Sequence, residues 1–400
     1  MADANPFLLH RQHLDVYQHA LEQGLTDADY RALVIEADDR VAAVDGAGFL
    51  VTPVVELCDL PEVAAPVIAK IETGNVGGSH KARHLFGLLL NTMIGERAEG
   101  VSAATDVPLA IASCGNAALG AAVVARAVDR TLQVFVPSDA DPTIVARLDD
   151  LGAEVQHCER RAGEAGDPCV LRLHEAIATG ARPFTVQGPV CPEVIDGCRT
   201  LGLELAGQLD ELGVEPRSIY VQIGGGALAT AVMDGLWRAW PGRGLPALHP
   251  VQAQSAHPYV AAWRRFAAGV LDALGVDDPG SDEARASLLT AHRASFDLDD
   301  ALAGADEMMV PWPGTPASVA SGILDDVTYD WRTVLRHQID TGGHPILVGE
   351  ATFVAARELA APQADPPPDE TGAAGLAGLL THAATSPSSV TGPAVVLLTG

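Results

Sequence analysis

The hydrophobic and polar positions of this chain alternate between short apolar runs and longer amphipathic stretches, with loops of small residues between them. Short apolar runs bounded by turn residues are typical of buried strands, and helical spacing of apolar residues predicts helices. We expect strands at residues 67–71, 109–112, 133–136, 184–186, 219–223 and 394–398. We expect helices from about residue 81, from residue 117 and near residues 200–212. This repeated order of strand, loop and helix favours a mostly parallel sheet with helices on both faces.

Three segments depart from this alternation. The first 50 residues look like acidic amphipathic helices, for example at residues 14–20 and 27–37, and they carry no visible chemistry. Residues 271–300 are rich in Asp and Ala, and residues 362–393 combine a Pro-Pro-Pro run with many Ala, Gly and Ser. We interpret the last two segments as surface insertions without a catalytic role.

Length, composition and charge narrow the class of protein. The 400 residues exceed what one compact core usually holds, so we expect two domains in one chain. A hydrophobic fraction of 48% with 40 glycines is typical of an α/β protein. The formal net charge of −27 argues against a nucleic-acid partner, because the phosphates of such a partner require a basic face.

A membrane segment and an export signal are not expected. Residues 107–125 carry no charge and approach the length of a spanning helix, but Pro108, Ser113, Gly115 and Asn116 divide them into strand, loop and helix. The N-terminus lacks the basic start and apolar core of a secretory signal. The six cysteines form no CxxC pair, so we expect free thiols in a reducing cytoplasm.

The chain contains only two lysines, Lys70 and Lys81, among its 25 basic residues. Arginine can replace lysine on a solvated surface, but it cannot form a Schiff base, which needs an amine that deprotonates. Lys81 follows a glycine loop at the expected start of a helix, where the helix dipole and Arg83 would favour the neutral amine. The alternative is a lysine that makes a surface ion pair at the start of the helix.

The segment around these lysines, residues 70–83, reads Lys-Ile-Glu-Thr-Gly-Asn-Val-Gly-Gly-Ser-His-Lys-Ala-Arg. It resembles the Lys-x-Glu-x-x-Asn-x-x-Gly-Ser-x-Lys-x-Arg motif of the tryptophan synthase β-like superfamily, the fold type II pyridoxal-phosphate enzymes. Further matches follow in the order of that family: Thr52-Pro53, Ser-Cys-Gly-Asn-Ala-Ala-Leu-Gly at 113–120, Val136-Pro137, Leu-Gly-Ala-Glu at 151–154, Gly197 with Thr200 and Glu204, and the glycine loop from Gly224.

The resemblance implies a fold, a domain arrangement and a cofactor. The fold would be α/β, with two open, twisted, mostly parallel sheets, flanking helices and pyridoxal 5'-phosphate in the interdomain cleft. Residues 1–90 and 188–400 would form a large cofactor-binding domain, and residues 91–187 a small domain that carries the Ser-Cys-Gly-Asn loop. Many relatives pair, so we also expect a homodimer.

The resemblance also implies roles for individual residues. Lys81 would hold the cofactor as a Schiff base and act in catalysis, Asn116 would bind its phenolic oxygen, and Thr399 would face its pyridine nitrogen. The cofactor phosphate would lie against Gly224, Gly225, Gly226, Ala227 and Leu228, at a helix start that favours anions. The substrate would contact Ser79, His80, Ser113, Cys114, Gly115 and Asn116.

Other interpretations of the same residues stay open. The glycine loop could serve a dinucleotide, although GxGxxG spacing is missing. The Gly-Asn turn could hold no ligand, and Thr399 could simply end a strand. His80 and His84 have the i, i+4 spacing of metal ligands, but no third ligand follows at motif spacing, so we expect no metal.

We expect the reaction to be β-elimination from a small hydroxy amino acid such as serine or threonine, giving a 2-oxo acid and ammonia. The loop at Gly224 resembles the glycine run of the dehydratases, although Ala227 replaces its fourth glycine. The alternatives are a replacement reaction like that of threonine synthase or cysteine synthase, through an aminoacrylate or related intermediate, and a non-catalytic amino-acid-binding regulator. Substrate selectivity would come from residues 252–259 and 315–322.

Overall fold

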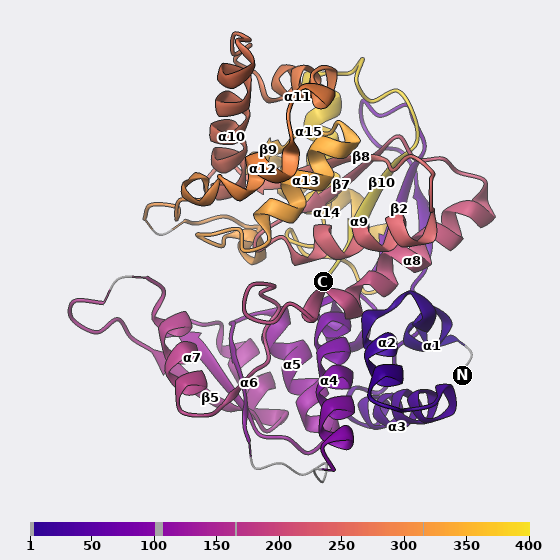
Figure 1. The fold of residues 1–400 in the computed structure, drawn as a ribbon, viewed down its shortest axis with the longest axis vertical. Coiled ribbons are helices and arrows are strands. Elements are labelled where there is room, and N and C mark those ends of the chain that lie inside the picture. The colour runs from indigo at the N-terminus through magenta and orange to yellow at the C-terminus, as the bar shows by residue number, and fades with distance from the viewer. Residues whose placement is uncertain (1–3, 101–106, 165, 315) are drawn as a thin grey trace. The chain divides into compact units, whose positions relative to one another are not determined.

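The computed structural model describes residues 4–100, 107–164, 166–314 and 316–400 (Figure 1). The chain forms two compact units. Unit 1 contains Met1–Val51 and Gly74–Glu204, and unit 2 contains Thr52–Thr73 and Leu205–Gly400. Each unit is built on its own β-sheet.

The sheet of unit 1 has four strands in the order β5-β4-β3-β6, and all of its pairings are parallel. Its strands are β3 (Leu109–Ala112), β4 (Leu132–Pro137), β5 (Glu154–Cys158) and β6 (Arg182–Pro183). The helices that follow them are α5 (Asn116–Ala127), α6 (Pro142–Asp150) and α7 (Pro168–Ala178). Leu173 of α7 packs on Ala110 and Phe135, so apolar side chains of the sheet and a helix form one core here.

Unit 1 also contains the N-terminal helices, which confirm the amphipathic pattern of the first 50 residues. They are α1 (Pro6–Leu9), η2 (Arg11–His13), α2 (Asp15–Glu22) and α3 (Asp27–Asp45). Thr26 and Asp29 form a capping box that begins α3. The rings of Phe7 and Phe86 lie 4.8 Å apart, which joins α1 to α4 (Lys81–Ala98).

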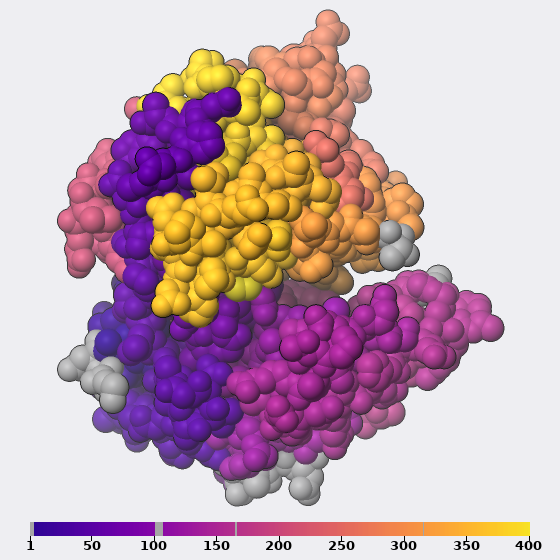
Figure 2. Space-filling view, turned by 180° about the vertical axis from the view of Figure 1, so that it is seen from behind, coloured from indigo at the N-terminus to yellow at the C-terminus, as the bar shows by residue number. Residues whose placement is uncertain are grey.

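The sheet of unit 2 has six strands in the order β1-β2-β10-β7-β8-β9, and only β1 and β2 pair antiparallel. The strands are β1 (Val54–Leu57), β2 (Val67–Ile71), β7 (Ser218–Gln222), β8 (Ala247–Ala253), β9 (Ile346–Val348) and β10 (Ala394–Leu398). Figure 2 shows the purple residues of the β1–β2 segment against the yellow C-terminal residues. The last strand of the chain therefore completes the middle of this sheet.

Helices and short 3-10 turns complete the fold. The remaining helices are α8 (Val194–Leu212), α9 (Ala227–Ala239), α10 (Pro258–Leu274), α11 (Asp282–Ala291), α12 (Leu298–Ala303), α13 (Trp331–Thr341), α14 (Glu350–Ala360) and α15 (Ala374–Thr385). The remaining turns are η3 (Val76–Gly78), η4 (Arg293–Ser295), η5 (Asp306–Met308), η6 (Ser321–Ile323) and η7 (Ala361–Gln363). Within the described residues, no helix is both long and apolar enough to span a bilayer.

The expected fold class is confirmed, since both sheets are mostly parallel and flanked by helices. The uncharged segment at 107–125 indeed divides into β3, a loop and α5. The strand expected at residues 184–186 is wrong, because the pairing is confined to Arg182 and Pro183. The amide of Phe184 donates one last hydrogen bond to Ala110, and the chain then leaves the edge of the sheet.

The interpretation of residues 362–393 as a surface insertion is also wrong, because α15 lies within this segment and is largely buried. Its small residues permit close approach to the sheet. A β-carbon on Gly375 would lie 2.7 Å from the carbonyl oxygen of Tyr220, and one on Gly378 would overlap Val251. Alanine and glycine in this stretch are therefore contact residues of the core.

The compact units differ from the expected domain boundaries. Residues 74–90, which include the start of α4, belong to unit 1 together with the Ser-Cys-Gly-Asn loop. The reason is packing: α4 lies along α5, and α3 also contacts α5. The other boundary falls within α8, between Glu204 and Leu205.

The crossing of α4 and α8 in unit 1 allows a test of this packing. A β-carbon on Gly87 would lie 2.5 Å from the Cα atom of Gly197, whereas one on Gly95 in the same helix would meet nothing within 4 Å. We expect Gly87→Ala to lower the free energy of unfolding by about 1–3 kcal/mol through overpacking. Gly95→Ala should be neutral or stabilising by up to about 1 kcal/mol. Equal effects of the two substitutions in urea denaturation would contradict the close crossing.

Candidate functional site

The two lysines have different surroundings. Lys70 lies in β2 and is fully buried, and its Nζ donates hydrogen bonds to the Thr52 carbonyl at 2.7 Å and the Gln208 Oε1 at 2.9 Å. The Thr52 hydroxyl in turn donates to Glu72. Lys70 thus has a structural role in unit 2, which makes Lys81 the better candidate for covalent chemistry.

Lys81 is the first residue of α4 and is half-buried. Its amide donates to the Ser79 hydroxyl at 3.3 Å, and both Ser79 and His80 are buried. The His80 side chain does not cap the helix, although it occupies the N-cap position. The start of α4 therefore combines a primary amine with the positive end of a helix dipole.

Arg83 anchors this helix start inside unit 1. Its guanidinium binds the Glu204 carboxylate through both terminal nitrogens, at 2.6 and 3.2 Å, and contacts the Thr200 hydroxyl at 3.0 Å. Both side chains of the ion pair are completely buried. The sequence suggests Arg83 as a positive neighbour of Lys81, but in the structure Glu204 balances its charge.

His80 and His84 are buried, uncharged side chains at the start of α4. Burial is the main cause that lowers the pKa of His80 well below its usual value and the pKa of His84 to about 3, with Lys81 adding to both shifts. His84 Nδ1 lies 2.8 Å from the Val194 carbonyl, which fixes its ring. Neither ring nitrogen of His80 has a hydrogen-bond partner among the described residues. His80 is therefore a neutral, unsatisfied polar group beside Lys81.

The Ser-Cys-Gly-Asn loop joins β3 to α5. The Ser113 amide donates to the Phe135 carbonyl at 3.2 Å, and Cys114 is exposed. Gly115 is the N-cap of α5, which begins at Asn116, and no side chain caps this end. A β-carbon on Gly115 would meet nothing within 4 Å, so this backbone faces open space. The first amides of α5 are thus suited to binding an anion.

Close packing brings the starts of α4 and α5 together in unit 1. A β-carbon on Gly77 would lie 3.2 Å from the Cα atom of Gly120, and one on Gly120 would lie 3.1 Å from the amide nitrogen of Ala82. These contacts join the loop before Lys81 to the second turn of α5. The structure therefore packs the segment around Lys81 against α5, the helix that follows the Ser-Cys-Gly-Asn loop.

The glycine loop of unit 2 connects β7 to α9. Gly226 adopts a left-handed conformation with φ of 98°, and α9 begins at Ala227 without a capping side chain. The positions of the missing β-carbons in this loop face residues of the same unit. A β-carbon on Gly224 would overlap Asp325, and one on Gly225 would lie 3.0 Å from Tyr329. Glycine is required here by this packing, and the uncapped amides of α9 remain as the anion-binding feature.

Thr399 follows β10 and is held by Gln222 at the end of β7. The Gln222 Nε2 donates to the Thr399 hydroxyl oxygen at 3.1 Å, and it also approaches the carbonyls of Gly372 and Leu397 at 3.3 and 3.4 Å. Those two carbonyls require the nitrogen of the amide, so the Thr399 oxygen accepts from Gln222. The Thr399 hydrogen can then point to another acceptor. No motif indicated this function of Gln222.

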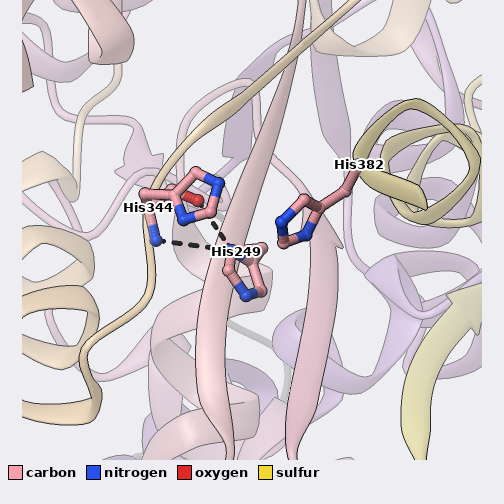
Figure 3. A group of neighbouring side chains, drawn as sticks. All are labelled: His249, His344 and His382. Carbon is pink, nitrogen blue, oxygen red and sulfur yellow. Dashed lines mark hydrogen bonds between the residues drawn. The ribbon is translucent and has the colours of Figure 1, made fainter. Parts of the chain in front are cut away.

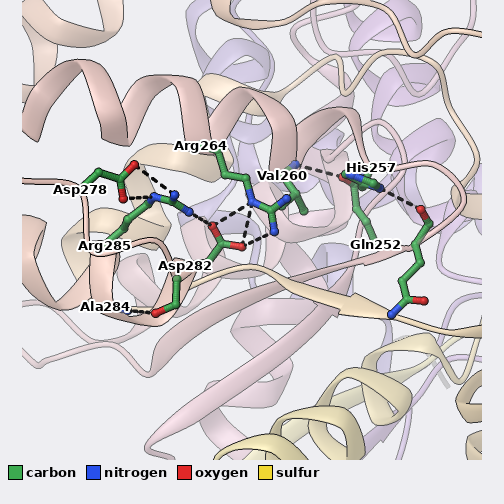
Figure 4. A network of polar contacts seen from close by, with 10 residues as sticks. Gln252, His257, Val260, Arg264, Asp278, Asp282, Ala284 and Arg285 are labelled. Atoms are coloured by element: carbon green, nitrogen blue, oxygen red, sulfur yellow. Dashed lines mark hydrogen bonds and ion pairs between the residues drawn. The ribbon is translucent and has the colours of Figure 1, made fainter.

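Gln252 fixes the residues next to the glycine loop. Its Nε2 donates to the Ile223 carbonyl at 3.2 Å, while its Oε1 accepts from the amides of Tyr259 and Val260 at the start of α10. Figure 4 shows the contact with Val260. Gln252 is fully buried. It begins one of the two regions expected to select the substrate, but its amide is used within unit 2. Thr315, at the start of the other region, lies outside the described residues.

Figure 4 also shows the ion pair that joins α10 to α11 and two pairs that hold the start of α11. Arg264 binds Asp282 with a shortest distance of 2.7 Å, and Arg285 contacts both Asp282 and Asp278. These partly exposed pairs contribute about 0–1 kcal/mol each. Their arginines thus have structural partners.

The predicted site residues fall into two groups, one in each unit. In unit 1 the group contains Ser79, His80, Lys81, Ser113, Cys114, Gly115 and Asn116. In unit 2 the group contains Gly224, Gly225, Gly226, Ala227, Leu228 and Thr399, at the ends of the neighbouring parallel strands β7 and β10. Ligands commonly bind at such carboxyl ends of parallel strands.

Comparison with known proteins shows the family to which the chain is similar. A family model described as "Pyridoxal-phosphate dependent enzyme" matches residues 47–400. A serine dehydratase-like protein from Mus musculus is 30% identical over 187 residues, which cover 46% of this chain and 52% of the relative. L-threonine ammonia-lyase from Geobacter sulfurreducens is 29% identical over 196 residues, which cover 49% of this chain and 44% of that protein. The chain thus spans about half the length of the curated relatives it matches.

Solved structures match most of the chain. A threonine deaminase from T.th. superposes with a TM-score of 0.63 at 20% identity, covering 92% of this chain and 97% of that one. Diaminopropionate ammonia-lyase from Escherichia coli gives a TM-score of 0.63 at 18% identity, and the match covers 92% of this chain and 88% of that one. At such low identity these likenesses show the fold alone, and they confirm the fold expected from the motifs.

The Arg83–Glu204 pair can be tested by removing its carboxylate. Glu204→Ala would leave the guanidinium buried without its partner, and we expect the free energy of unfolding to fall by about 3–5 kcal/mol. Glu211→Ala, at an exposed position of the same helix, is the control and should change it by less than about 0.5 kcal/mol. Urea denaturation of both variants measures the difference. Similar midpoints for the two variants would contradict an anchoring role for Glu204.

Proposed function

Because the chain belongs to the family of pyridoxal-phosphate dependent enzymes, we propose that it converts a small hydroxy amino acid, such as serine or threonine, into a 2-oxo acid and ammonia. The names of its relatives, serine dehydratase-like and L-threonine ammonia-lyase, support this reaction class. The observation that carries the proposal is the position of Lys81, which opens α4 next to the uncapped start of α5.

The residues of both groups fit the cofactor. A phosphate is an anion, and the starts of α5 and α9 each present amides that no side chain caps. An aromatic nitrogen is an acceptor, and the buried Thr399 hydroxyl has a hydrogen that Gln222 does not use. An aldehyde reacts with a primary amine, and Lys81 presents one at the start of α4, whereas the Lys70 amine is buried in β2.

We assign the roles as follows. Lys81 would hold the cofactor through its ε-amine, and once released by the substrate the same amine would take the Cα proton. Asn116 would donate to the phenolic oxygen of the cofactor, and the Ser113 hydroxyl and the amides of residues 114–116 would hold the substrate carboxylate. Gly224, Gly225, Gly226, Ala227 and Leu228 bind the phosphate through backbone amides.

When bound, pyridoxal phosphate supplies a conjugated ring that stabilises negative charge at the substrate Cα. Lys81 would pass the proton it has taken to the β-hydroxyl, which would leave as water, and the enamine product would take up one water to give the 2-oxo acid and ammonia. Neutral His80 adds no charge beside Lys81, so it leaves the amine able to exchange a proton. Ser79 and Cys114 complete the proposed substrate contacts.

The assembly and location of the protein are part of the same proposal. We propose a homodimer, supported by the resemblance to a family in which pairing is common. We also propose a reducing cytoplasm, supported by the lack of a disulfide between any of the six cysteines, all of which the structure describes. Size-exclusion chromatography with light scattering measures the assembly directly.

The first test concerns Lys81. Lys81→Arg keeps the positive charge but lacks a reactive amine, so we expect loss of the visible absorption of the bound cofactor and a fall in 2-oxo acid release of at least about 10²–10⁴-fold. Lys70→Arg changes the other lysine. It should reduce stability but retain the visible band in the folded protein.

The reaction itself is tested by adding serine, threonine and diaminopropionate one at a time to the purified protein. Release of a 2-oxo acid supports elimination. An intact visible band without any 2-oxo acid would refute the proposed reaction. Formation of a β-substituted amino acid when a thiol is supplied would instead favour a replacement reaction.

A second test concerns Thr399. Thr399→Val has the same shape but no hydroxyl, so we expect cofactor affinity to fall about two- to tenfold, in line with one lost hydrogen bond. The visible band should shift as well. Thr399→Ser is the matched control and should keep both properties near those of the original chain. Unchanged affinity and spectrum in Thr399→Val would remove Thr399 from the cofactor site.

A further inference from the structure

Three buried histidines meet in unit 2, and none of them was among the predicted site residues. His249 lies in β8, His344 precedes β9, and His382 lies in α15. One ring nitrogen of each lies within 4.8 Å of those of the other two. Segments far apart in the sequence thus converge on one point (Figure 3).

The three rings pack directly on one another. The ring centroids lie 4.7 Å apart for His249 and His344, 5.0 Å for His249 and His382, and 4.8 Å for His344 and His382. Tyr220 stacks on the ring of His249 at 4.7 Å. Apolar side chains of the right size would fill this space without a desolvation cost. Burying three imidazoles costs free energy, which a bound ligand would offset.

The hydrogen bonds leave one nitrogen of His382 available. His382 Nδ1 lies 2.8 Å from the Tyr220 hydroxyl, whereas its Nε2 is buried and has no hydrogen-bond partner within the described residues. In Figure 3 the ring of His382 points from α15 toward the other two rings. A metal-binding histidine typically has its second ring nitrogen held by an oxygen, as Tyr220 holds His382.

His249 is held from the other side. Its Nδ1 lies 2.9 Å from the carbonyl oxygen and 3.3 Å from the amide nitrogen of His344 (Figure 3). This contact places the segment before β9 against β8. The rings of His249 and His382 are therefore each oriented by a contact at Nδ1.

The surroundings of the cluster suit a transition-metal ion. All three histidine side chains are buried. The imidazole nitrogen is a common ligand of zinc and other divalent transition metals.

We propose that His249, His344 and His382 bind one divalent transition-metal ion, with zinc as the best match to three imidazole ligands. Zinc–nitrogen bonds of about 2.0–2.1 Å place tetrahedral ligand atoms about 3.3 Å apart, so the rings close by roughly 1 Å or more on binding. The ion would link β8, the segment before β9 and α15. It stabilises unit 2 and takes no part in the proposed elimination.

Zinc content of the untagged holoenzyme tests this site. After treatment with a chelator, we expect the full chain to rebind about one equivalent of zinc, measured by mass spectrometry against a chromophoric chelator, with a rise in Tm. His174→Ala, which removes an exposed histidine, is the control and should bind the same equivalent. Absence of a bound equivalent in both proteins would overturn the proposal.

Substitutions within the cluster show whether these histidines bind the ion. His344→Gln and His382→Gln should each lose the equivalent, while the cofactor spectrum reports that the protein is still folded. Tyr220→Phe removes only the hydroxyl that holds His382, and we expect zinc affinity to fall about 10–100-fold. Zinc affinity equal to that of His174→Ala in all three variants would overturn the proposal, whether or not the protein releases a 2-oxo acid.

Discussion

The buried ion pair between Arg83 and Glu204 is the contact on which unit 1 depends most. Two opposite charges without solvent exposure are tolerated only when each satisfies the other, so Glu204 in α8 fixes where α4 begins. Lys81 lies two residues before Arg83, in the same anchored first turn of α4. The close approach of Gly87 and Gly197 one turn further along removes the remaining freedom of the two helices.

In unit 2, buried amide side chains fix the positions of the loops. Gln222 and Gln252 are both buried, and each connects a strand to a loop that the proposed site needs. Their hydrogen bonds orient Thr399 and the residue before the glycine loop. Charged side chains at these two positions would cost more free energy to desolvate. Apolar side chains could not form hydrogen bonds with the neighbouring backbone groups.

Much of the fold was predictable from the sequence because strands 67–71, 109–112 and 394–398 are mostly apolar runs of the kind that parallel sheets bury on both faces. Lys81 was predictable for a chemical reason, since lysine is almost eliminated elsewhere. The wrong interpretations concern packing between segments far apart in the sequence. The buried helix α15 looks like a polar linker because alanine and glycine occur both in linkers and in closely packed helices.

The burial of Lys70 has a consequence for selectivity between amines. Pyridoxal phosphate is a reactive aldehyde, and in most proteins many surface lysines compete for it. Here one of the two lysine amines is engaged by Thr52 and Gln208 inside unit 2. Lys81 is therefore the more accessible of the two lysine side chains. The scarcity of lysine limits competing reactions of an aldehyde at other side chains.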